Sequence, residues 1–458
     1  MSRARFPGFY KLSVEDRLEV IRQHEWLHDD DVQELLSGDH LLVPELADKM
    51  IENVVGVMGL PLGVGLNFVI NKRDYLIPLV VEEPSIVAAL SSAAKTFSAG
   101  GGMTARADES LLIGQVQVVN PSDMEAGERQ VLAHKAELLA KLNALHPNMI
   151  ARGGGAHDIE VRRFPRTSDN PQMLVVHLLV DTCDAMGANM INTMCEEIAP
   201  DIEALTGGRV FLRILSNLTD RAVVRASVTV ATDQLSGKGY SGEEVRDGIV
   251  LASQFANIDP YRAATHNKGI MNGIDPVAIA TGNDWRAIEA AAHAYASREG
   301  RYTALTHWQV TQSGDLHGEI EIPLKVGTQG GSLRANPSAN IAHRMLGTPN
   351  ARELAEVMAS AGLAQNFSAI RALSTVGIQK GHMSLHARSV ALSAGVPQSR
   401  FEKVVSRLIE KDDIKIETAH AILAELEEDP VSLDRQTRKH LNEAVSYTHL
   451  TLPTKRIV

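Results

Sequence analysis

Two short runs within residues 257–287 place a cation and a carboxylate among small and amide side chains. They are THNKG, which contains Lys268, and TGNDW, which contains Asp284. A fixed ammonium beside a substrate oxygen stabilises the negative charge that develops there in a transition state, and a carboxylate can hold that ammonium in position. Glycines punctuate the stretch, so we expect a loop that approaches a ligand closely.

Two further segments carry groups that could transfer protons. Glu83 lies in VVEEPSIVAA, where an apolar run meets Pro84 and predicts a strand-to-helix junction. If burial raised its pKa, this carboxyl group could donate a proton. His382 lies in QKGHMSLHAR, and an imidazole titrates near neutral pH. Each residue alone has a plainer interpretation, as a solvent-exposed lysine, a surface carboxylate or a structural histidine.

Together these segments resemble the active site of 3-hydroxy-3-methylglutaryl-CoA (HMG-CoA) reductase, most closely the class II, soluble bacterial form. The likeness covers nearly the whole chain. It implies an oxidoreductase that converts HMG-CoA and two NAD(P)H to mevalonate and CoA, or the reverse oxidation of mevalonate. The implied catalytic residues are Lys268 for the oxyanion, Asp284 to position Lys268, Glu83 as the proton donor, and His382 to protonate the CoA thiolate.

Substrate-binding residues also follow from the resemblance. Arg262 would pair with the free carboxylate of the HMG group, which suits a fork-shaped donor. The other expected substrate contacts are Ser85, Asn272, Asn217, Gln365 and His386. The spacing of His382 and His386 could instead indicate zinc, but no third ligand is evident and no metal is expected. No G-x-S-x-G motif supports serine-dependent hydrolysis of a CoA thioester.

The run DAMGANM at 184–190 follows an expected strand and opens an expected helix. It lacks G-x-G-x-x-G, so a Rossmann domain is not indicated. Free N–H groups at the start of a helix can nevertheless receive phosphate oxygens. In the resembled family this stretch binds the nicotinamide cofactor, and the residues carried over are Asp184, Met186, Gly187, Asn189 and Asn192.

His146 bears on the choice of cofactor. NADH-specific members of the resembled family carry an acidic residue at this place, which suits the ribose hydroxyls. The acid is absent here, so a 2′-phosphate would not be repelled, and His146 or Arg152 could contact it. The sequence therefore predicts NADPH or NADH, with NADPH slightly favoured.

The elements that must position these residues follow from hydrophobic periodicity. Residues 110–217 predict the order β-α-β-β-α-β, which is ferredoxin-like rather than Rossmann-like. We expect an α/β (α+β) protein in which this small cofactor domain interrupts a larger helix-rich domain. The expected segments are 1–109 and 218–377 for the large substrate-binding domain, 110–217 for the small domain, 378–446 for a C-terminal helical flap, and 447–458 for a tail unlike the family.

Composition excludes several classes of partner. A net charge of −11 argues against binding to nucleic acid or to anionic membranes. Two cysteines in 458 residues indicate a reducing compartment without a disulfide framework. No apolar stretch is long enough to span a membrane, and the start lacks the apolar core of a secretory signal, so we expect a cytoplasmic protein.

A helix is expected over residues 44–56, where Pro44 would occupy the first turn. Its run IENVVG resembles the dimer-interface signature of the family, although a plain packing helix would show the same periodicity. The resemblance implies a homodimer in which each active site is shared between the subunits.

Overall fold

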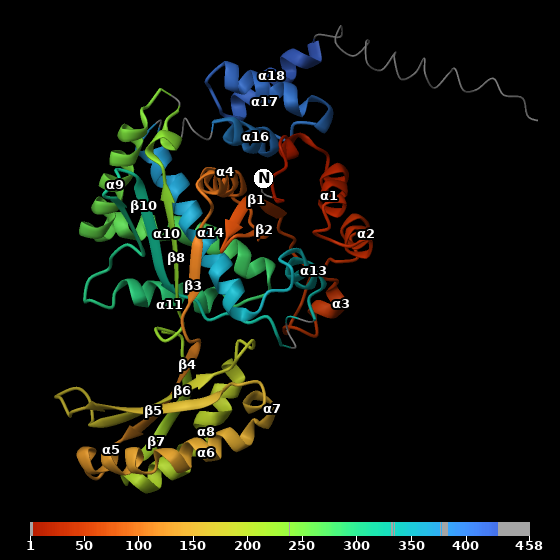
Figure 1. Ribbon diagram of the computed structural model, residues 1–458. Helices are drawn as coiled ribbons and strands as arrows, with labels where there is room; N and C mark the ends of the chain where they lie inside the picture. Colours follow the sequence, from red (N-terminus) through yellow and green to blue (C-terminus); the bar gives the residue numbers. More distant parts are fainter. Residues whose placement is uncertain are drawn as a thin grey trace, which may run out of the picture. The chain divides into compact units, whose positions relative to one another are not determined.

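The computed structural model describes residues 3–237, 239–330, 333, 335–375, 377 and 383–428. The chain divides into two compact units, Met1–Gly377 and Ile378–Val458 (Figure 1). Each unit has a hydrophobic core of its own.

A hairpin leads to the first of the candidate residues. Strands β1 (Leu62–Ile70) and β2 (Arg73–Val80) pair antiparallel through Asn71 and Lys72, whose φ angles of 51° and 66° fit a tight hairpin turn. The chain then enters helix α4 (Ile86–Ala99). The predicted strand-to-helix junction at Glu83 is therefore confirmed.

The helix expected over residues 44–56 is wrong for most of its length. Helix α3 (Pro44–Ala47) ends early, and Asn53 has a left-handed φ of 59°, which an α-helix cannot contain. Several apolar side chains that follow α3 are exposed, among them Met50, Ile51, Val55 and Met58. Upstream lie α1 (Val14–Gln23) and α2 (Asp29–Ser37).

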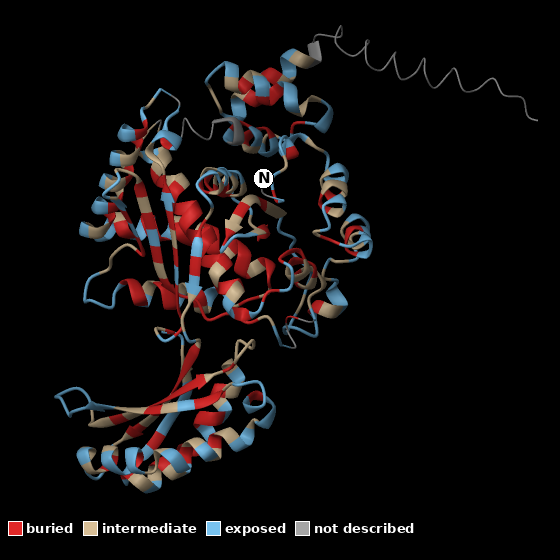
Figure 2. Ribbon diagram, viewed as in Figure 1, coloured by how far each residue is buried: buried red, intermediate tan, exposed pale blue. Residues whose placement is uncertain are grey.

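A four-stranded antiparallel sheet forms one side of the main core, in the order β3-β8-β10-β9. Its strands are β3 (Thr104–Ala107), β8 (Val223–Val230), β9 (Thr306–Val310) and β10 (Leu316–Pro323). Residues of β8 alternate: Ala226 and Val228 are buried, whereas Arg225 is exposed. This period of two is the reason the sheet has one apolar and one polar face (Figure 2).

Helices cover the apolar face of this sheet (Figure 1). Helices α9 (Gly242–Ile258), α14 (Ala351–Leu373) and α11 (Trp285–Ala296) contact its strands. Helix α10 (Pro260–Ala280) packs on α14, α9 and β2, with α13 (Pro337–Met345) beside it. The loop expected around Lys268 is therefore wrong, because this part of residues 257–287 is helix α10. Asp259 caps the helix and Pro260 occupies its first turn, a start signal that outweighs the glycines.

Residues 111–216 form a second antiparallel sheet in the order β5-β6-β4-β7. Its strands are β4 (Leu111–Val119), β5 (Gly155–Phe164), β6 (Met173–Asp181) and β7 (Arg209–Ser216). Helices α5 (Met124–Ala133), α6 (Lys135–Leu145) and α8 (Ala188–Thr206) pack on one face, and α7 is Pro147–Ile150 (Figure 1). The predicted β-α-β-β-α-β order is confirmed, and its first helical stretch is divided at His134 into α5 and α6.

The second unit is helical over its described residues. It contains α16 (Met383–Ser393), α17 (Phe401–Glu410) and α18 (Ile416–Glu428), packed around Ala391, Val404, Leu408 and Ile422. The expected tail at 447–458 lies outside the described residues. Over the part of the chain that the structure describes, no helix combines the length and apolar character needed to cross a membrane.

The crossing of α10 and α14 gives a stability prediction. A Cβ atom at Gly273 would lie 2.5 Å from the carbonyl oxygen of Ala361, whereas a Cβ at Gly269 on the same helix would meet nothing within 4 Å. We expect Gly273→Ala to lower the free energy of unfolding by about 1–3 kcal/mol through overpacking. The control Gly269→Ala should raise it by up to about 1 kcal/mol, because alanine favours helix. Urea unfolding of both variants checks this, and a stabilised Gly273→Ala would contradict the close crossing.

Candidate active site

Buried polar contacts fix the rotation of α10 about its axis. His266 Nε2 lies 2.6 Å from Thr306 Oγ1, and Asn267 Nδ2 donates to the carbonyl oxygen of Thr303 at 2.9 Å. Burial lowers the pKa of His266 to about 3, so this imidazole is neutral at physiological pH. Because positions 266 and 267 face inward, the next residue, Lys268, projects from the exposed side of the helix.

Lys268 meets Glu83 there. Its Nζ donates to Glu83 Oε2 at 3.0 Å, which joins residues 185 positions apart in the sequence. The two side chains are 61% and 48% exposed, so the burial that the proton-donor hypothesis asked of Glu83 is not provided by this chain alone. Ser85 follows at the start of α4 with a left-handed φ of 76°.

Asp284 has a different set of contacts from the one expected. It caps α11: its carboxylate accepts from the backbone N–H groups of Arg286 and Ala287, each at 3.1 Å, and forms an ion pair with the Arg286 side chain at 3.2 Å. Among the described residues, the hydrogen bond of Lys268 goes to Glu83 and not to Asp284. The expected hydrogen bond between Lys268 and Asp284 is therefore not formed among the described residues. Asp284 instead stabilises the first turn of α11.

The expected substrate-binding residues Arg262 and Asn272 share helix α10 with Lys268. Burial lowers the pKa of the half-buried Arg262, and within the described residues its guanidinium has no hydrogen-bonded or ionic partner. Gln365 on α14 is 7% exposed, and its Oε1 is buried and has no partner in the part of the chain that the structure describes. Its Cβ lies 2.9 Å from the position a Cβ would take at Gly273, which places Gln365 against the same helix.

The remaining predicted residues are Asn217, His386 and His382. Asn217 is exposed immediately after β7, and His386 is exposed on α16 in the second unit. His382 lies outside the described residues. Within the described ranges, no group of three or more His, Cys, Asp or Glu side chains is arranged to hold a metal ion.

Some of the predicted cofactor-binding residues make structural hydrogen bonds within the protein, and others do not. The Asp184 carboxylate accepts from Ala351 N–H at 2.9 Å, and Asn192 Oδ1 accepts from Leu215 N–H at 3.0 Å, so both side chains have a structural task. Gly187 precedes α8 with φ 87°, and a Cβ there would lie 2.4 Å from Thr182 Cγ2. Met186 is half-buried and Asn189 is exposed beside this helix start.

His146 and Arg152 lie in a segment that adjoins the start of α8. The Cys183 thiol donates to the carbonyl oxygen of Arg152 at 3.7 Å, and a Cβ at Gly154 would lie 2.6 Å from Cys183 Sγ. The Arg152 side chain is exposed, whereas His146 Nε2 is buried without a partner. The two sequence segments expected to bind the cofactor are thus neighbours.

A short peptide links this region to the Asp284 region. Gly327 N–H donates to Asn283 Oδ1 at 2.8 Å, and Thr328 N–H donates to the carbonyl oxygen of Asp184 at 2.8 Å. Gly327 and Thr328, which are consecutive, therefore bind the segment before Asp284 and the loop that contains Asp184, respectively.

Lys325, which the sequence reading did not single out, lies in the same region. It is 7% exposed, and its Nζ donates to Ser110 Oγ at 3.0 Å. Burial lowers its pKa to about 8. The only sequence signal was a lysine inside the apolar run IPLKVG.

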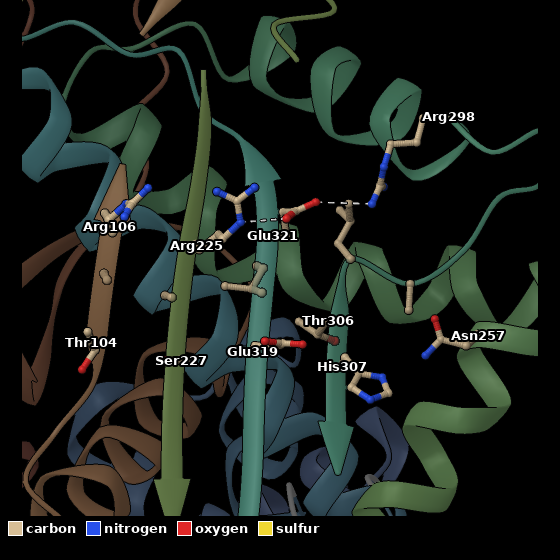
Figure 3. A pocket seen from close by; sticks show the side chains of 15 residues that line it. Thr104, Arg106, Arg225, Ser227, Asn257, Arg298, Thr306, His307, Glu319 and Glu321 are labelled. Atoms are coloured by element: carbon tan, nitrogen blue, oxygen red, sulfur yellow. Dashed lines mark hydrogen bonds and ion pairs between the residues drawn. The ribbon is translucent and has the colours of Figure 1, made fainter. Parts of the chain in front are cut away.

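A cavity of about 450 Å³ lies elsewhere, on the polar face of the sheet β3-β8-β10-β9 (Figure 3). Three arginines line it, and two of them meet the same carboxylate: Arg225 and Arg298 pair with Glu321 at 2.8 and 3.4 Å. None of the predicted site residues lines this cavity. The candidate site is therefore the α10 surface around Lys268 and not this hollow.

Known proteins are similar to this chain over most of its length. A family model described as hydroxymethylglutaryl-coenzyme A reductase matches residues 13–387. The 3-hydroxy-3-methylglutaryl-coenzyme A reductase of Archaeoglobus fulgidus is 48% identical over 423 residues, which are 92% of this chain and 95% of that protein. A probable reductase of the same name from Borreliella burgdorferi is 35% identical over 75% of this chain and 77% of its own length.

Solved structures agree with this similarity. The reductase from Streptococcus pneumoniae is 44% identical and superposes with a TM-score of 0.79, covering 92% of this chain and all (100%) of that chain. A class II structure from the same organism, bound to NADPH in open conformations, has a TM-score of 0.78 and 44% identity over 81% of this chain and 100% of that chain. Identity and coverage at this level, together with the family match, show that the chain belongs to the hydroxymethylglutaryl-coenzyme A reductase family.

Proposed function

We propose that this protein converts HMG-CoA and two reduced nicotinamide cofactors to mevalonate and CoA, or catalyses the reverse oxidation. The observation that carries the site assignment is the contact between Lys268 and Glu83, two residues distant in sequence that meet on an exposed surface of α10. Arg262, six residues before Lys268 on the same helix, has a guanidinium without a partner among the described residues, and we assign it to the carboxylate of the HMG group.

Charge stabilisation by Lys268 accounts for the reduction steps. The nicotinamide cofactor supplies one hydride for each of the two reductions. Each addition develops negative charge on the substrate carbonyl oxygen, and the Lys268 ammonium stabilises that charge more in the transition state than in the ground state. The tetrahedral product of the first reduction expels the CoA thiolate, which His382 protonates; this role is proposed from sequence alone.

Glu83 then donates a proton to the alkoxide of the second reduction. Its carboxyl group is 48% exposed in the isolated chain, so water reaches it there. Bound substrate would displace that water and bring the alkoxide beside the carboxyl group that donates to it. We assign Asp284 an indirect role, because its carboxylate fixes the first turn of α11.

We assign the cofactor to the region between α8 and residues 146–152. Among the described residues the α8 N-terminus has no side-chain cap, so its free N–H groups can receive phosphate oxygens. Gly187 lets Thr182 pack against this helix start, because a Cβ there would lie 2.4 Å from Thr182 Cγ2. His146 Nε2, buried and without a partner among the described residues, belongs to the adjoining segment. We assign Met186, Gly187 and Asn189 to direct contact, and Asp184 and Asn192 to shaping the loop.

A homodimer completes the proposed site. The exposed apolar residues after α3, such as Ile51 and Val55, need a partner surface, and the resembled dimer signature covers the same run. A second subunit over the Lys268–Glu83 pair would also remove water from it. The two free cysteines fit a cytoplasmic location.

Replacing Lys268 should remove activity without unfolding the chain. Loss of one charge-stabilising group costs about 10²–10³-fold in kcat, so Lys268→Ala should oxidise NADPH with HMG-CoA at least about a hundredfold more slowly. Its ion pair is exposed and adds little stability, so the melting temperature should stay near that of wild type. Lys95→Ala, at an exposed position on α4, is the control.

The same assay separates reduction from other CoA-thioester chemistry. A hydrolase or transferase would release CoA thiol without a fall in absorbance at the nicotinamide band. An unimpaired Lys268→Ala enzyme would remove the central assignment.

Substitution of Arg262 should act on substrate binding. Arg262→Lys keeps the charge and loses the forked, two-point contact with a carboxylate. Since a hydrogen bond to a charged group contributes about 1.5–3 kcal/mol, we expect the KM for HMG-CoA to rise about 10- to 100-fold with little change in the KM for NADPH. Steady-state kinetics with each substrate varied in turn measure this. An unchanged KM for HMG-CoA would place the carboxylate elsewhere.

Cofactor preference should follow position 146. We propose that the wild type prefers NADPH, because no acid repels the 2′-phosphate there. His146→Asp should lower kcat/KM for NADPH relative to NADH by about tenfold or more, as one repulsive charge costs at least about 1.4 kcal/mol in a partly buried site. Asn170→Asp, in the exposed turn between β5 and β6, adds the same single negative charge and is the control. A strong NADH preference in the wild type would contradict the proposal.

A further inference from the structure

A second group of titratable side chains joins α10 to α11. Asp275 of α10 is hydrogen-bonded to Glu289 of α11. Glu289 Oε2 pairs with His293 Nε2 at 2.5 Å, and His293 Nδ1 lies 2.7 Å from the hydroxyl of Tyr302. Tyr302 in turn is hydrogen-bonded to Asn267, the neighbour of Lys268. The chain of contacts thus begins between the two helices and ends beside the candidate catalytic lysine.

The two carboxyl groups cannot both be ionised at low cost. Asp275 Oδ1 is buried and has no other partner among the described residues. Burial, and then the hydrogen bond with Glu289, raises the pKa of Asp275 to about 8. The hydrogen bond from His293 lowers the pKa of Glu289, and the same bond raises that of His293. At neutral pH Asp275 therefore holds a proton and donates it to the Glu289 carboxylate, which also accepts from the imidazolium.

No other charged group competes for this proton within the described residues. The electrostatic influences on Asp275 come from Glu289, and those on Glu289 come from His293 and Asp275. Tyr302 faces the outer end of the chain, and burial raises its pKa further from neutrality. The elements packed against α10 contribute no additional charge to the pair.

The position of the pair connects it to the candidate site. Lys268, Asn272 and Asp275 follow at spacings of four and three residues, so they share one face of α10. Glu289 lies on α11 about one turn beyond Asp284, the cap of that helix. A bond between Asp275 and Glu289 therefore ties together the two helices that carry Lys268 and Asp284.

We propose that Asp275 and Glu289 are positioning residues, whose shared proton locks α11 against α10 and so fixes Asp284 and the α11 N-terminus relative to Lys268. The proposal rests on the proposed function, because it concerns the same reaction. Loss of the proton sets two carboxylates against each other in a partly buried place, which pushes the helices apart. Activity then falls on the alkaline side.

Asp275→Asn tests this, because an amide keeps a donor toward Glu289 and cannot ionise. We expect wild-type kcat to fall by up to about tenfold per pH unit above about 8, and the variant to match wild type at pH 7 within about threefold and to lose that decline. Glu289→Gln, in which an ionised Asp275 can accept from the new amide, should also lose the decline. Asp247→Asn on exposed α9 should keep it.

The melting temperature measured without substrate tests the Asp275–Glu289 pair independently of catalytic turnover. Because the folded chain holds a proton that the unfolded chain releases, stability falls as pH rises from about 4 through about 8. Asp275→Asn removes this loss, so its melting temperature should exceed that of wild type at pH 9 and not at pH 5. Parallel melting curves, or an alkaline decline in kcat unchanged by both amide variants, would overturn the proposal. Altered melting in an enzyme that does not reduce HMG-CoA would instead refute the proposed function.

Discussion

The packing of α10 is the constraint on which the candidate site depends. The helix packs against α14 so closely that position 273 has no room for a side chain. The polar contacts of His266 and Asn267 prevent the helix from rotating about its axis. A helix fixed in this way has one remaining free face. Lys268 is exposed on it, and Asn272, four residues later, lies beside Lys268 and is half-buried. Core packing, rather than loop geometry, therefore aims the charged groups.

The same constraint extends through short connections to the rest of the first unit. The turn after α10 carries Asn283, which accepts from the Gly327 N–H, and the adjacent Thr328 N–H donates to Asp184. A displacement of α10 would therefore reach both the cap of α11 and the loop before α8. This physical continuity explains why Asp184 is engaged in backbone contacts although it lies in the DAMGANM run.

The sequence predicted the elements whose signals are local. Alternating apolar residues and clear turns gave the β-α-β-β-α-β order, and Pro84 marked the junction at Glu83. The error at residues 260–280 came from weighing glycine content above the Asp259–Pro260 start signal, since Gly273 serves a close helix crossing and not a turn. The Lys268–Glu83 contact spans 185 positions, and only the resemblance to a known family pointed to it. The Asp275–Glu289 pair had no such guide, because its chemistry arises from burial between two helices.

The exposure of the Lys268–Glu83 pair bears on how the enzyme works. The charged groups of the pair lie 3.0 Å apart, and each side chain is more than two-fifths exposed to water. In such surroundings two unit charges at this distance attract each other by only about 1–2 kcal/mol. A hundredfold rate effect needs about 2.7 kcal/mol from Lys268 alone, so the isolated chain does not provide the dielectric that the reaction requires. Excluding water is therefore a separate task from placing the charges. This chain places them through α10, and the exclusion must come from substrate, cofactor and the second subunit that we propose.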